Sequence, residues 1–210
     1  MKYKVMIVED QTMPRELFEL RVQSSERFEV ALSIDNAALT DVYCLRFPVD
    51  LILMDVVTRG GESGLDAAER IKRAFPQIKI IIVTSMPECS YLSRAREIGV
   101  ESFWYKEEQR ESLLDVMERT MEGESVYPDA TPEMQLGLTS SYELTDRELE
   151  VLREMTGGDT NQEIAERLHM SVATVKTHIL NMLEKTGFRN RTELAVRARE
   201  SGLVILNRKK

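Results

Sequence analysis

Short apolar runs alternate with amphipathic stretches over the first part of the chain. Five runs are rich in Val and Ile and nearly continuous in apolar character, as expected for strands covered on both faces. The predicted strands are Lys4–Val8, Phe28–Ser33, Leu51–Met54, Ile78–Val83 and Glu101–Trp104. The predicted helices between and after them are Pro14–Ser24, Ala37–Leu45, Gly64–Ala74, Glu88–Ile98 and Glu107–Met121. Five strand–helix units predict an α/β domain with a doubly wound, five-stranded parallel sheet over residues 1–122.

Residues 123–141 do not continue this alternation. Pro128, Pro132, Gly137 and the run Thr139-Ser140-Ser141 are typical of turns and loops, and they predict a linker between two domains. Beyond it, residues 142–210 predict a small all-α domain. Its four predicted helices begin after Thr145, at Asn161, after Ser171 and at Thr192.

The charge of the chain is unevenly distributed. Overall, 28 Lys and Arg against 36 Asp and Glu give a net charge of −8, which by itself argues against a nucleic-acid partner. Residues 167–210, however, contain 10 basic and 3 acidic residues. A basic C-terminal region on an acidic protein is typical of a small module that binds a polyanion such as DNA.

The composition indicates a soluble protein. Of the 210 residues, 42% are hydrophobic and 30% are charged, and no apolar run approaches the roughly 18 residues that a transmembrane helix needs. The first apolar stretch ends at Glu9-Asp10, too early for a signal peptide. Cys44 and Cys89 lie far apart, without CxxC spacing, and are expected to be reduced thiols. We therefore expect a cytoplasmic protein without a membrane partner.

Polar residues follow the predicted strands. Glu9 and Asp10 follow the first strand, Asp55 follows the third, Thr84 ends the fourth and Lys106 lies just past the fifth. Functional groups of a doubly wound sheet gather at the carboxyl ends of its strands. Three carboxylates there repel one another unless a cation joins them, and a hard, oxygen-liganded ion such as Mg²⁺ fits this demand. Asp55 would then attack a phosphoryl group, whose oxygens Lys106 and Thr84 would stabilise.

Each of these residues also has a simpler explanation. A Glu-Asp pair or a lone Asp after a strand is usually a solvated turn or a helix cap, and a lone Thr or Lys indicates almost nothing. The phosphorylation site is favoured by the joint pattern of five groups at four strand ends in the right order.

Residues 1–122 resemble the CheY-like receiver domains. The matching segments are Val5-Met6-Ile7-Val8-Glu9-Asp10, Leu51-Ile52-Leu53-Met54-Asp55, Thr84 and Lys106. The resemblance implies that a sensor histidine kinase phosphorylates Asp55. It also implies that Glu9, Asp10 and Asp55 hold Mg²⁺, with the backbone carbonyl of Val57 as a further ligand. In this family the position of Phe103 is a switch aromatic that follows the Thr84 hydroxyl, although core packing is the simpler explanation of Phe103.

The loop after Asp55 departs from the family pattern. Receivers usually carry Met-Pro three and four residues after the phosphorylated Asp. Here the segment Val56-Val57-Thr58-Arg59-Gly60-Gly61-Glu62-Ser63-Gly64 has no Pro and one extra residue. Two adjacent glycines predict a less constrained loop, which puts the metal affinity and the phosphate lifetime in question. Arg59 could approach a bound phosphate, but a solvated loop position is the simpler explanation.

The basic region has the layout of a helix-turn-helix motif. Asn161–Leu168 predicts the support helix, His169-Met170-Ser171 the turn, and Val172–Thr186 the helix that would enter the major groove of double-stranded DNA. The residues expected to contact DNA are Thr174, Lys176, Thr177, His178, Leu180, Asn181, Arg189 and Arg191. Taken singly, Lys176 or Arg191 is most simply a solvated surface charge.

Residues 142–205 resemble the LuxR-type four-helix DNA-binding domain. The matching blocks are Leu144-Thr145-Asp146-Arg147-Glu148, Asn161-Gln162-Glu163-Ile164-Ala165, Thr174-Val175-Lys176-Thr177-His178 and Asn190-Arg191-Thr192-Glu193-Leu194. The resemblance implies that Lys176, Thr177 and Leu180 face bases and that the helix Thr192–Ser201 pairs in dimers. Together the two domains resemble the response regulators of the NarL/FixJ type.

The favoured function is a phosphorylation-controlled transcription regulator that is not an enzyme. Phosphorylation of Asp55 would shift the receiver to another conformer, and a homodimer would then bind promoter DNA, with RNA polymerase as an optional further partner. One alternative keeps DNA binding but makes the receiver independent of phosphorylation. An aspartyl-phosphate phosphatase is disfavoured because Val57 stands where a second Asp would be expected. A pure protein-interaction adaptor is disfavoured because it would leave the C-terminal motif without a role.

Overall fold

The computed structural model describes residues 2–88, 90–106 and 111–203, which form two compact units. Of the described residues, the first unit comprises 2–85 and 90–130 and the second comprises 86–88 and 131–203, so the expected linker 123–141 contributes residues to both. Cys89, residues 107–110 of the helix predicted at Glu107–Met121, and residues 204–210 lie outside the described residues.

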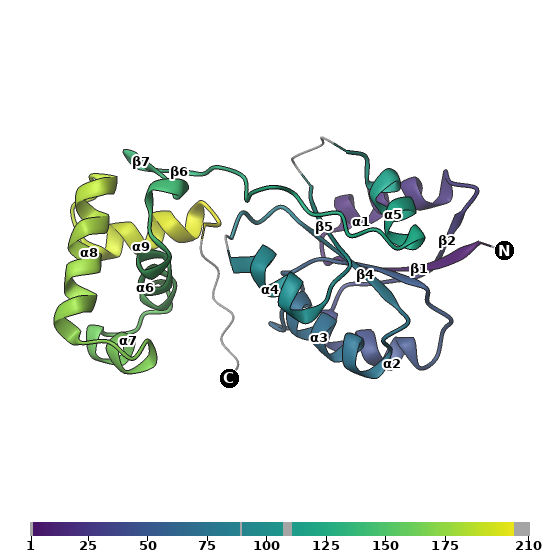
Figure 1. The fold of residues 1–210 in the computed structure, drawn as a ribbon, viewed down its shortest axis with the longest axis horizontal. Helices are drawn as coiled ribbons and strands as arrows, with labels where there is room; N and C mark the ends of the chain where they lie inside the picture. Colours follow the sequence, from purple (N-terminus) through teal and green to yellow (C-terminus); the bar gives the residue numbers. More distant parts are fainter. Residues whose placement is uncertain (1, 89, 107–110, 204–210) are drawn as a thin grey trace. The chain divides into compact units, whose positions relative to one another are not determined.

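The first unit is built on a five-stranded parallel sheet with the strand order β2-β1-β3-β4-β5 (Figure 1). Its strands are β1 (Tyr3–Val8), β2 (Phe28–Ile34), β3 (Leu51–Met54), β4 (Lys79–Thr84) and β5 (Ser102–Tyr105). Each strand end lies within one residue of its prediction. The predicted fold class is confirmed, because continuous apolar runs form strands that helices cover on both faces.

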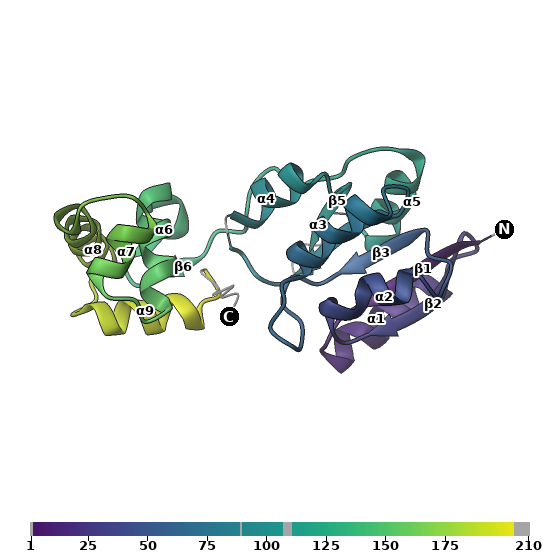
Figure 2. The same ribbon diagram turned by 90° about the horizontal axis from the view of Figure 1, so that it is seen from below.

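Five α-helices flank this sheet. Helices α1 (Thr12–Gln23) and α5 (Leu113–Glu122) cover one face; α2 (Thr40–Cys44), α3 (Gly64–Ala74) and α4 (Ser90–Ile98) cover the other (Figures 1 and 2). The short 3-10 helix η1 (Ala37–Leu39) precedes α2, so the single helix predicted at Ala37–Leu45 is in fact divided. Within the described residues, α5 begins later than predicted, because Ser112 accepts a hydrogen bond from the Asp115 amide and caps the helix at Leu113.

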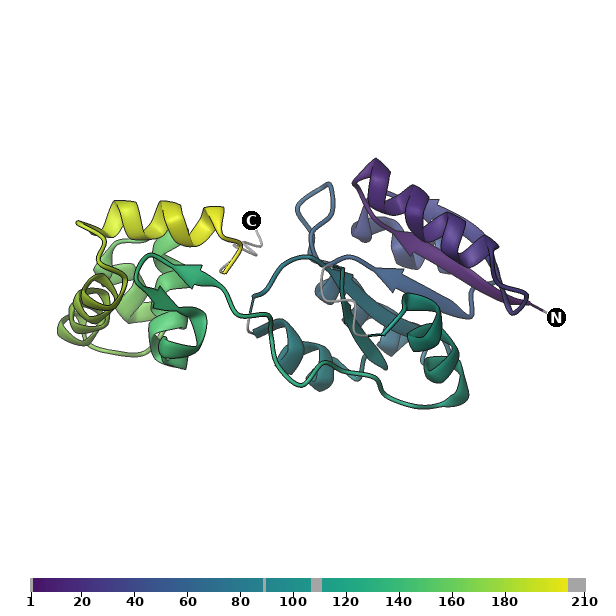
Figure 3. The same cartoon turned by 90° about the horizontal axis from the view of Figure 1, so that it is seen from above.

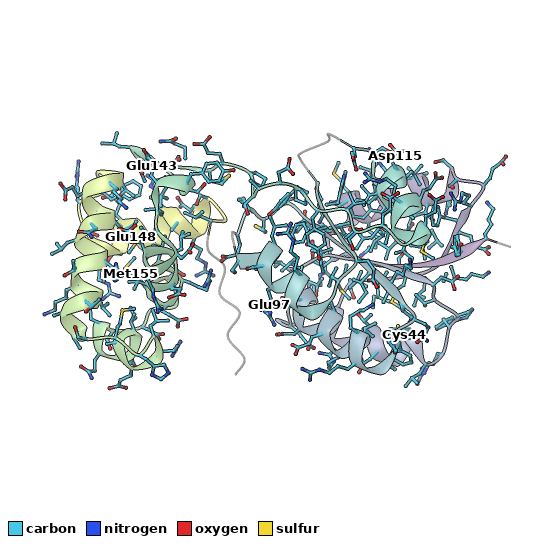
Figure 4. The ribbon with its side chains drawn as sticks, viewed as in Figure 1. Cys44, Glu97, Asp115, Glu143, Glu148 and Met155 are labelled. Atoms are coloured by element: carbon cyan, nitrogen blue, oxygen red, sulfur yellow. The ribbon has the colours of Figure 1, made fainter. Side chains whose placement is uncertain are left out.

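The apolar side of α1 and α5 makes one core with the sheet. Phe18 and Val22 from α1 pack with Leu113 and Met117 from α5 against inward residues of the strands. The side chain of Cys44, on α2 and labelled in Figure 4, is a half-buried free thiol. Burial raises the pKa of Cys44 to about 11, which keeps this thiol protonated at neutral pH.

The second unit is a four-helix domain preceded by a hairpin, shown from another side in Figure 3. The elements are β6 (Gln135–Leu136), β7 (Thr139–Ser140), η2 (Ser141–Glu143), α6 (Asp146–Thr156), α7 (Asn161–Arg167), α8 (Val172–Thr186) and α9 (Arg191–Glu200). The hairpin was not predicted, because each strand has only two residues. It turns at Gly137, whose φ is +64°, and it buries Leu136 in the helical core.

Each of the four helices begins at a capping residue. The side chains of Thr145, Thr160, Ser171 and Asn190 each accept a hydrogen bond from the backbone amide three residues later. Such caps satisfy amide groups that have no partner inside the helix. Thr145 and Glu148 form a capping box, and the helix predicted to begin after Thr145 is confirmed. Of the helices within the described residues, none is long and apolar enough to cross a membrane.

Candidate functional site

Four parallel strands of the first unit end beside one another and bring the predicted polar residues together. Asp55 directly follows β3, and its amide donates to the Val8 carbonyl at the end of β1, 2.9 Å away. Lys106 directly follows β5, and its amide donates to the carbonyl of Thr84, the last residue of β4, at 2.9 Å. The register therefore places residues from distant parts of the sequence at one edge of the sheet.

Three carboxylates form the floor of this site. Glu9, Asp10 and Asp55 each offer one oxygen, and these oxygens all lie within 4.8 Å of one another. Glu9 and Asp55 are buried and Asp10 is half-buried. The Lys106 Nζ atom donates to Asp55 Oδ2 at 2.8 Å and also to Glu9 Oε2. One ammonium thus faces two buried carboxylates.

This arrangement changes the proton affinity of its members. Burial, together with the neighbouring charge of Asp55, raises the pKa of Glu9. Burial also raises the pKa of Asp55 despite the contact with Lys106. Burial alone would lower the pKa of Lys106, but the two carboxylates raise it overall. Three carboxyl groups thus face one ammonium at this edge, and clustered carboxylate oxygens fit a hard divalent cation such as Mg²⁺.

The unusual loop after Asp55 is held by hydrogen bonds to a neighbouring loop. The hydroxyl of Thr58 is buried and accepts from the amide of Ala37 at 3.0 Å. The Arg59 amide donates to the Asp35 carbonyl at 3.3 Å, and the exposed Arg59 guanidinium also pairs with the Asp35 carboxylate. These bonds constrain this part of the loop, and the expectation that the whole loop is less constrained than in other receivers stays a prediction. The loop lacks the Pro that receivers usually carry, and the hydrogen bond from the Ala37 amide to the Thr58 hydroxyl constrains its path.

Gly64, at the start of α3, lies directly against the Asp55 backbone. Its amide donates to the Val56 carbonyl at 2.8 Å. A Cβ atom at Gly64 would lie 1.9 Å from the Asp55 carbonyl oxygen, which no side chain can tolerate without a shift of the backbone. The expected metal ligand Val57 lies within this loop and pairs with Ser63. Residues at both ends of the loop therefore constrain its path.

The predicted switch residues Thr84 and Phe103 are both buried. The Phe103 ring contacts two tyrosine rings, with its centroid 5.0 Å from that of Tyr105 and 6.3 Å from that of Tyr127. The contact with Tyr127 was missed by sequence reasoning, which assigned that residue to a linker. An aromatic residue in a segment otherwise rich in loop formers was the available signal.

The second unit presents most of the expected DNA-contacting residues on α8. Thr174, Lys176, Thr177, Leu180 and Asn181 are exposed, whereas His178 is half-buried. Leu180 is 64% exposed, which is unusual for a large apolar side chain on a helix that packs into a core. The opposite side of α8 buries Val175, Ile179 and Met182. Apart from the half-buried His178, the α8 residues expected to contact DNA are therefore exposed rather than part of the core.

The connections around α8 also match a helix-turn-helix. Helix α7 ends at Arg167, and His169 adopts a left-handed conformation with φ of 52° in the turn that precedes α8. Arg189 is exposed beyond the end of α8. The Arg191 guanidinium instead donates to Asn161 Oδ1 at 2.9 Å and to the Asp159 carbonyl at 2.8 Å. A DNA contact of Arg191 stays a prediction, and it would compete with these two bonds.

The two units thus have the architecture of a receiver with a buried acidic site and of a helix-turn-helix domain. Residues 5–118 match the response regulator receiver domain, and residues 142–198 match the bacterial regulatory proteins of the luxR family. The chain belongs to the response regulators that carry a LuxR-family DNA-binding domain, which confirms the family expected from the sequence.

Relatives and solved structures agree with this assignment. The response regulator protein VraR of Staphylococcus epidermidis strain RP62A is 34% identical over 211 residues, covering 97% of this chain and 100% of VraR. VraR of Staphylococcus aureus strain Mu3 is 32% identical over 209 residues, with the same coverage.

Two solved structures have the same fold. The first is a structure of two RcsB dimers bound to two parallel DNAs. It has a TM-score of 0.63 and 19% sequence identity, and the match covers 95% of this chain and 98% of the RcsB chain. The other is RcsB from Salmonella enterica serovar Typhimurium bound to promoter P1flhDC in the presence of BeF3-. Its TM-score is 0.62 with 21% sequence identity, and the match covers 97% of this chain and 100% of the RcsB chain. The phosphorylation-independent alternative is not favoured by these comparisons.

Proposed function

We propose that a sensor histidine kinase phosphorylates Asp55 and that this event controls homodimerisation and binding of promoter DNA. The observation that carries the proposal is the buried Asp55 carboxylate, 2.8 Å from Lys106 Nζ and grouped with oxygens of Glu9 and Asp10. A carboxylate oxygen of Asp55 attacks the phosphorus atom, and the bond from phosphorus to the donor breaks. The product is an acyl phosphate on the receiver.

The other residues of the site bind and neutralise the phosphoryl group. Glu9, Asp10 and Asp55, with the Val57 carbonyl, would hold Mg²⁺, which supplies positive charge to the phosphoryl oxygens. The Lys106 ammonium stabilises the same oxygens, and the Thr84 hydroxyl donates to them. Phe103 then follows Thr84, which changes the surface of the receiver.

The exposed face of α8 is the proposed DNA-reading surface. Lys176, Thr177 and Leu180 would contact base edges or phosphates in the major groove, with Leu180 suited to a thymine methyl group. Thr174, His178, Asn181, Arg189 and Arg191 complete the proposed contact set. Dimerisation would bring two such helices to two half-sites, and RNA polymerase is a further proposed partner.

The test is light scattering after size exclusion, first with Mg²⁺ and then with beryllofluoride added as a phosphoryl mimic. We expect a monomer with Mg²⁺ alone and a dimer with beryllofluoride, and no dimer for Asp55→Ala. An unchanged monomer mass in wild-type protein contradicts the proposed switch. If the protein is a dimer in every sample, equal affinity for duplex DNA with and without the mimic contradicts it.

A further inference from the structure

The chain that leaves α5 does not extend freely from the first unit but turns back along it (Figure 3). Residues 124–130, here called the strap, lie outside both matched family regions. The Phe103 amide donates to the Val126 carbonyl at 2.8 Å, and the Val126 amide donates to Ser102 Oγ at 3.1 Å. Strand β5 is the edge of the sheet, so the strap satisfies a backbone group that an edge strand leaves unpaired.

The side chain of Tyr127 makes three contacts with the first unit. Its hydroxyl donates to the Val100 carbonyl at 2.8 Å, and the Arg96 guanidinium carbon lies 4.7 Å from its ring centroid. Burial raises the pKa of Tyr127 well above its usual range, so the hydroxyl remains a donor at neutral pH. The third contact is with Phe103, the expected switch aromatic.

The strap and the expected switch residue Phe103 therefore make two contacts with each other, one through the backbone and one through the side chains. Phe103 is 1% exposed, its amide is bonded to the strap, and its ring packs against Tyr127. Packed aromatic rings do not shift without loss of contact area to their neighbours. A movement of Phe103 thus costs contacts of the strap.

We propose that the strap transmits the phosphorylation state of Asp55 to the DNA-binding unit. Phosphorylation of Asp55 moves Phe103, and this movement releases Val126 and Tyr127 from β5. This inference rests on the proposed function, because it uses the phosphorylation switch. Seven released residues add roughly 20 Å of reach to the connection with the DNA-binding unit. That reach would let two DNA-binding units of one dimer meet their half-sites.

Hydrogen exchange of the full chain, with Mg²⁺ alone and with beryllofluoride, tests the inference. We expect the amides of Phe103 and Val126 to exchange at least about tenfold faster when beryllofluoride is present, with no change in Asp55→Ala. If peptides around Thr84 and Lys106 respond and the protein dimerises while the strap keeps its protection, the inference is overturned and the proposed function stands. If beryllofluoride changes neither the exchange of any peptide nor the oligomeric state, both the inference and the proposed function are overturned.

Variants provide a second test. In Tyr127→Ala we expect fast exchange of Val126 even without beryllofluoride, so that the mimic no longer changes the strap while the Thr84 peptide still responds. The matched control is Tyr142→Ala, which removes an exposed tyrosine of the second unit and should keep the wild-type response. Unaltered fluorescence of Trp104, the only tryptophan, shows that the first unit of each variant is folded. If Val126 in Tyr127→Ala exchanges as slowly as in the wild type without beryllofluoride and still responds to the mimic, the inference is overturned.

Discussion

Glu148 connects two helices of the DNA-binding unit through one carboxylate oxygen. Its Oε2 atom accepts from the Thr145 amide at 2.8 Å and from Lys185 Nζ at 2.7 Å. Lys185 also donates to the Glu143 carbonyl at 2.9 Å. Glu148, labelled in Figure 4, therefore joins the start of α6 to the end of α8, the helix proposed to read DNA.

The first prediction concerns the stability supplied by this carboxylate. Burial alone would raise the pKa of Glu148, but Lys185 and Thr145 lower it below the ordinary 4.5. A lowered folded-state pKa stabilises the fold fully above the unfolded-state pKa, and the stabilisation is lost as the pH falls through the folded-state value. We expect Glu148→Gln to destabilise the second unit by ~1–3 kcal/mol at pH 7 and by less below pH 4.5.

Hydrogen exchange of α6 and α8 in the full chain, followed against urea at each pH, measures this effect. Glu200→Gln is the matched control, because Glu200 pairs with Arg197 on the exposed surface of α9, where such pairs contribute little. Equal losses in both variants, or a loss independent of pH, would show that the Lys185 contact is not the cause.

The second prediction concerns Lys176 on the exposed face of α8. Removal of a phosphate-contacting cation reduces the number of counterions released when DNA binds. We expect Lys176→Ala to lower the affinity for a mixed-sequence DNA duplex roughly 3- to 10-fold and to reduce the slope of log K against log salt by about one. Fluorescence anisotropy at several salt concentrations measures both quantities.

Arg147→Ala is the control for this measurement. Arg147 is an exposed cation on α6 that pairs with Glu150 at 2.6 Å, and it lies outside the proposed contact set. The same loss of slope in Arg147→Ala would mean that the general charge of the unit, rather than α8, drives binding.

At the scale of elements, the start of α3 depends on a residue without a side chain. Gly64 allows α3 to begin directly against the Asp55 carbonyl, a contact that the sequence did not show although it placed Gly64 at the start of this helix. The third prediction is that Gly64→Ala destabilises the first unit by about 2 kcal/mol or more, because the backbone must shift. Urea unfolding followed by Trp104 fluorescence measures this loss.

Gly61→Ala provides the contrast for Gly64. Gly61 has φ of +78°, but a Cβ atom there would meet nothing within 4 Å. This variant adds conformational strain without a collision, and we expect it to cost about 1 kcal/mol. If the two variants are equally stable, the close approach of α3 to Asp55 is not what requires glycine at position 64.

At the scale of the molecule, the proposed dimer needs a surface that a second copy can cover. Met13, Leu17 and Leu20 follow one another at helical spacing on α1 and are exposed, Leu20 at 65%. A contiguous exposed apolar stripe of this kind is typical of a protein–protein interface. The fourth prediction is that Leu20→Glu prevents the dimerisation expected with beryllofluoride, because a charge would be buried at the contact.

Leu45→Glu distinguishes this stripe from other exposed apolar residues. Leu45 follows α2 and is 76% exposed, so the substitution is chemically the same at a site of similar exposure. We expect this variant to dimerise like wild type in light scattering. Loss of the dimer in Leu45→Glu but not in Leu20→Glu would place the interface on α2 instead.

Several features could be predicted from the sequence because the signals are local. Continuous Val- and Ile-rich runs predicted each strand of the five-stranded sheet to within one residue, and Thr145 and Ser171 marked the starts of two helices of the second unit. The proximity of the five polar residues at strand ends could also be predicted, because parallel strands place their carboxyl ends at one edge of the sheet.

Other features were decided only by the tertiary structure, because their partners are distant in the sequence. The bonds of Val126 and Tyr127 to the β5 region, the anchor of Thr58 on Ala37 and the engagement of Arg191 with α7 are of this kind. A local pattern of Pro, Gly and Ser predicts a loop but not the surface on which the loop lies. Side-chain geometry across the fold determines which of these segments are held in place.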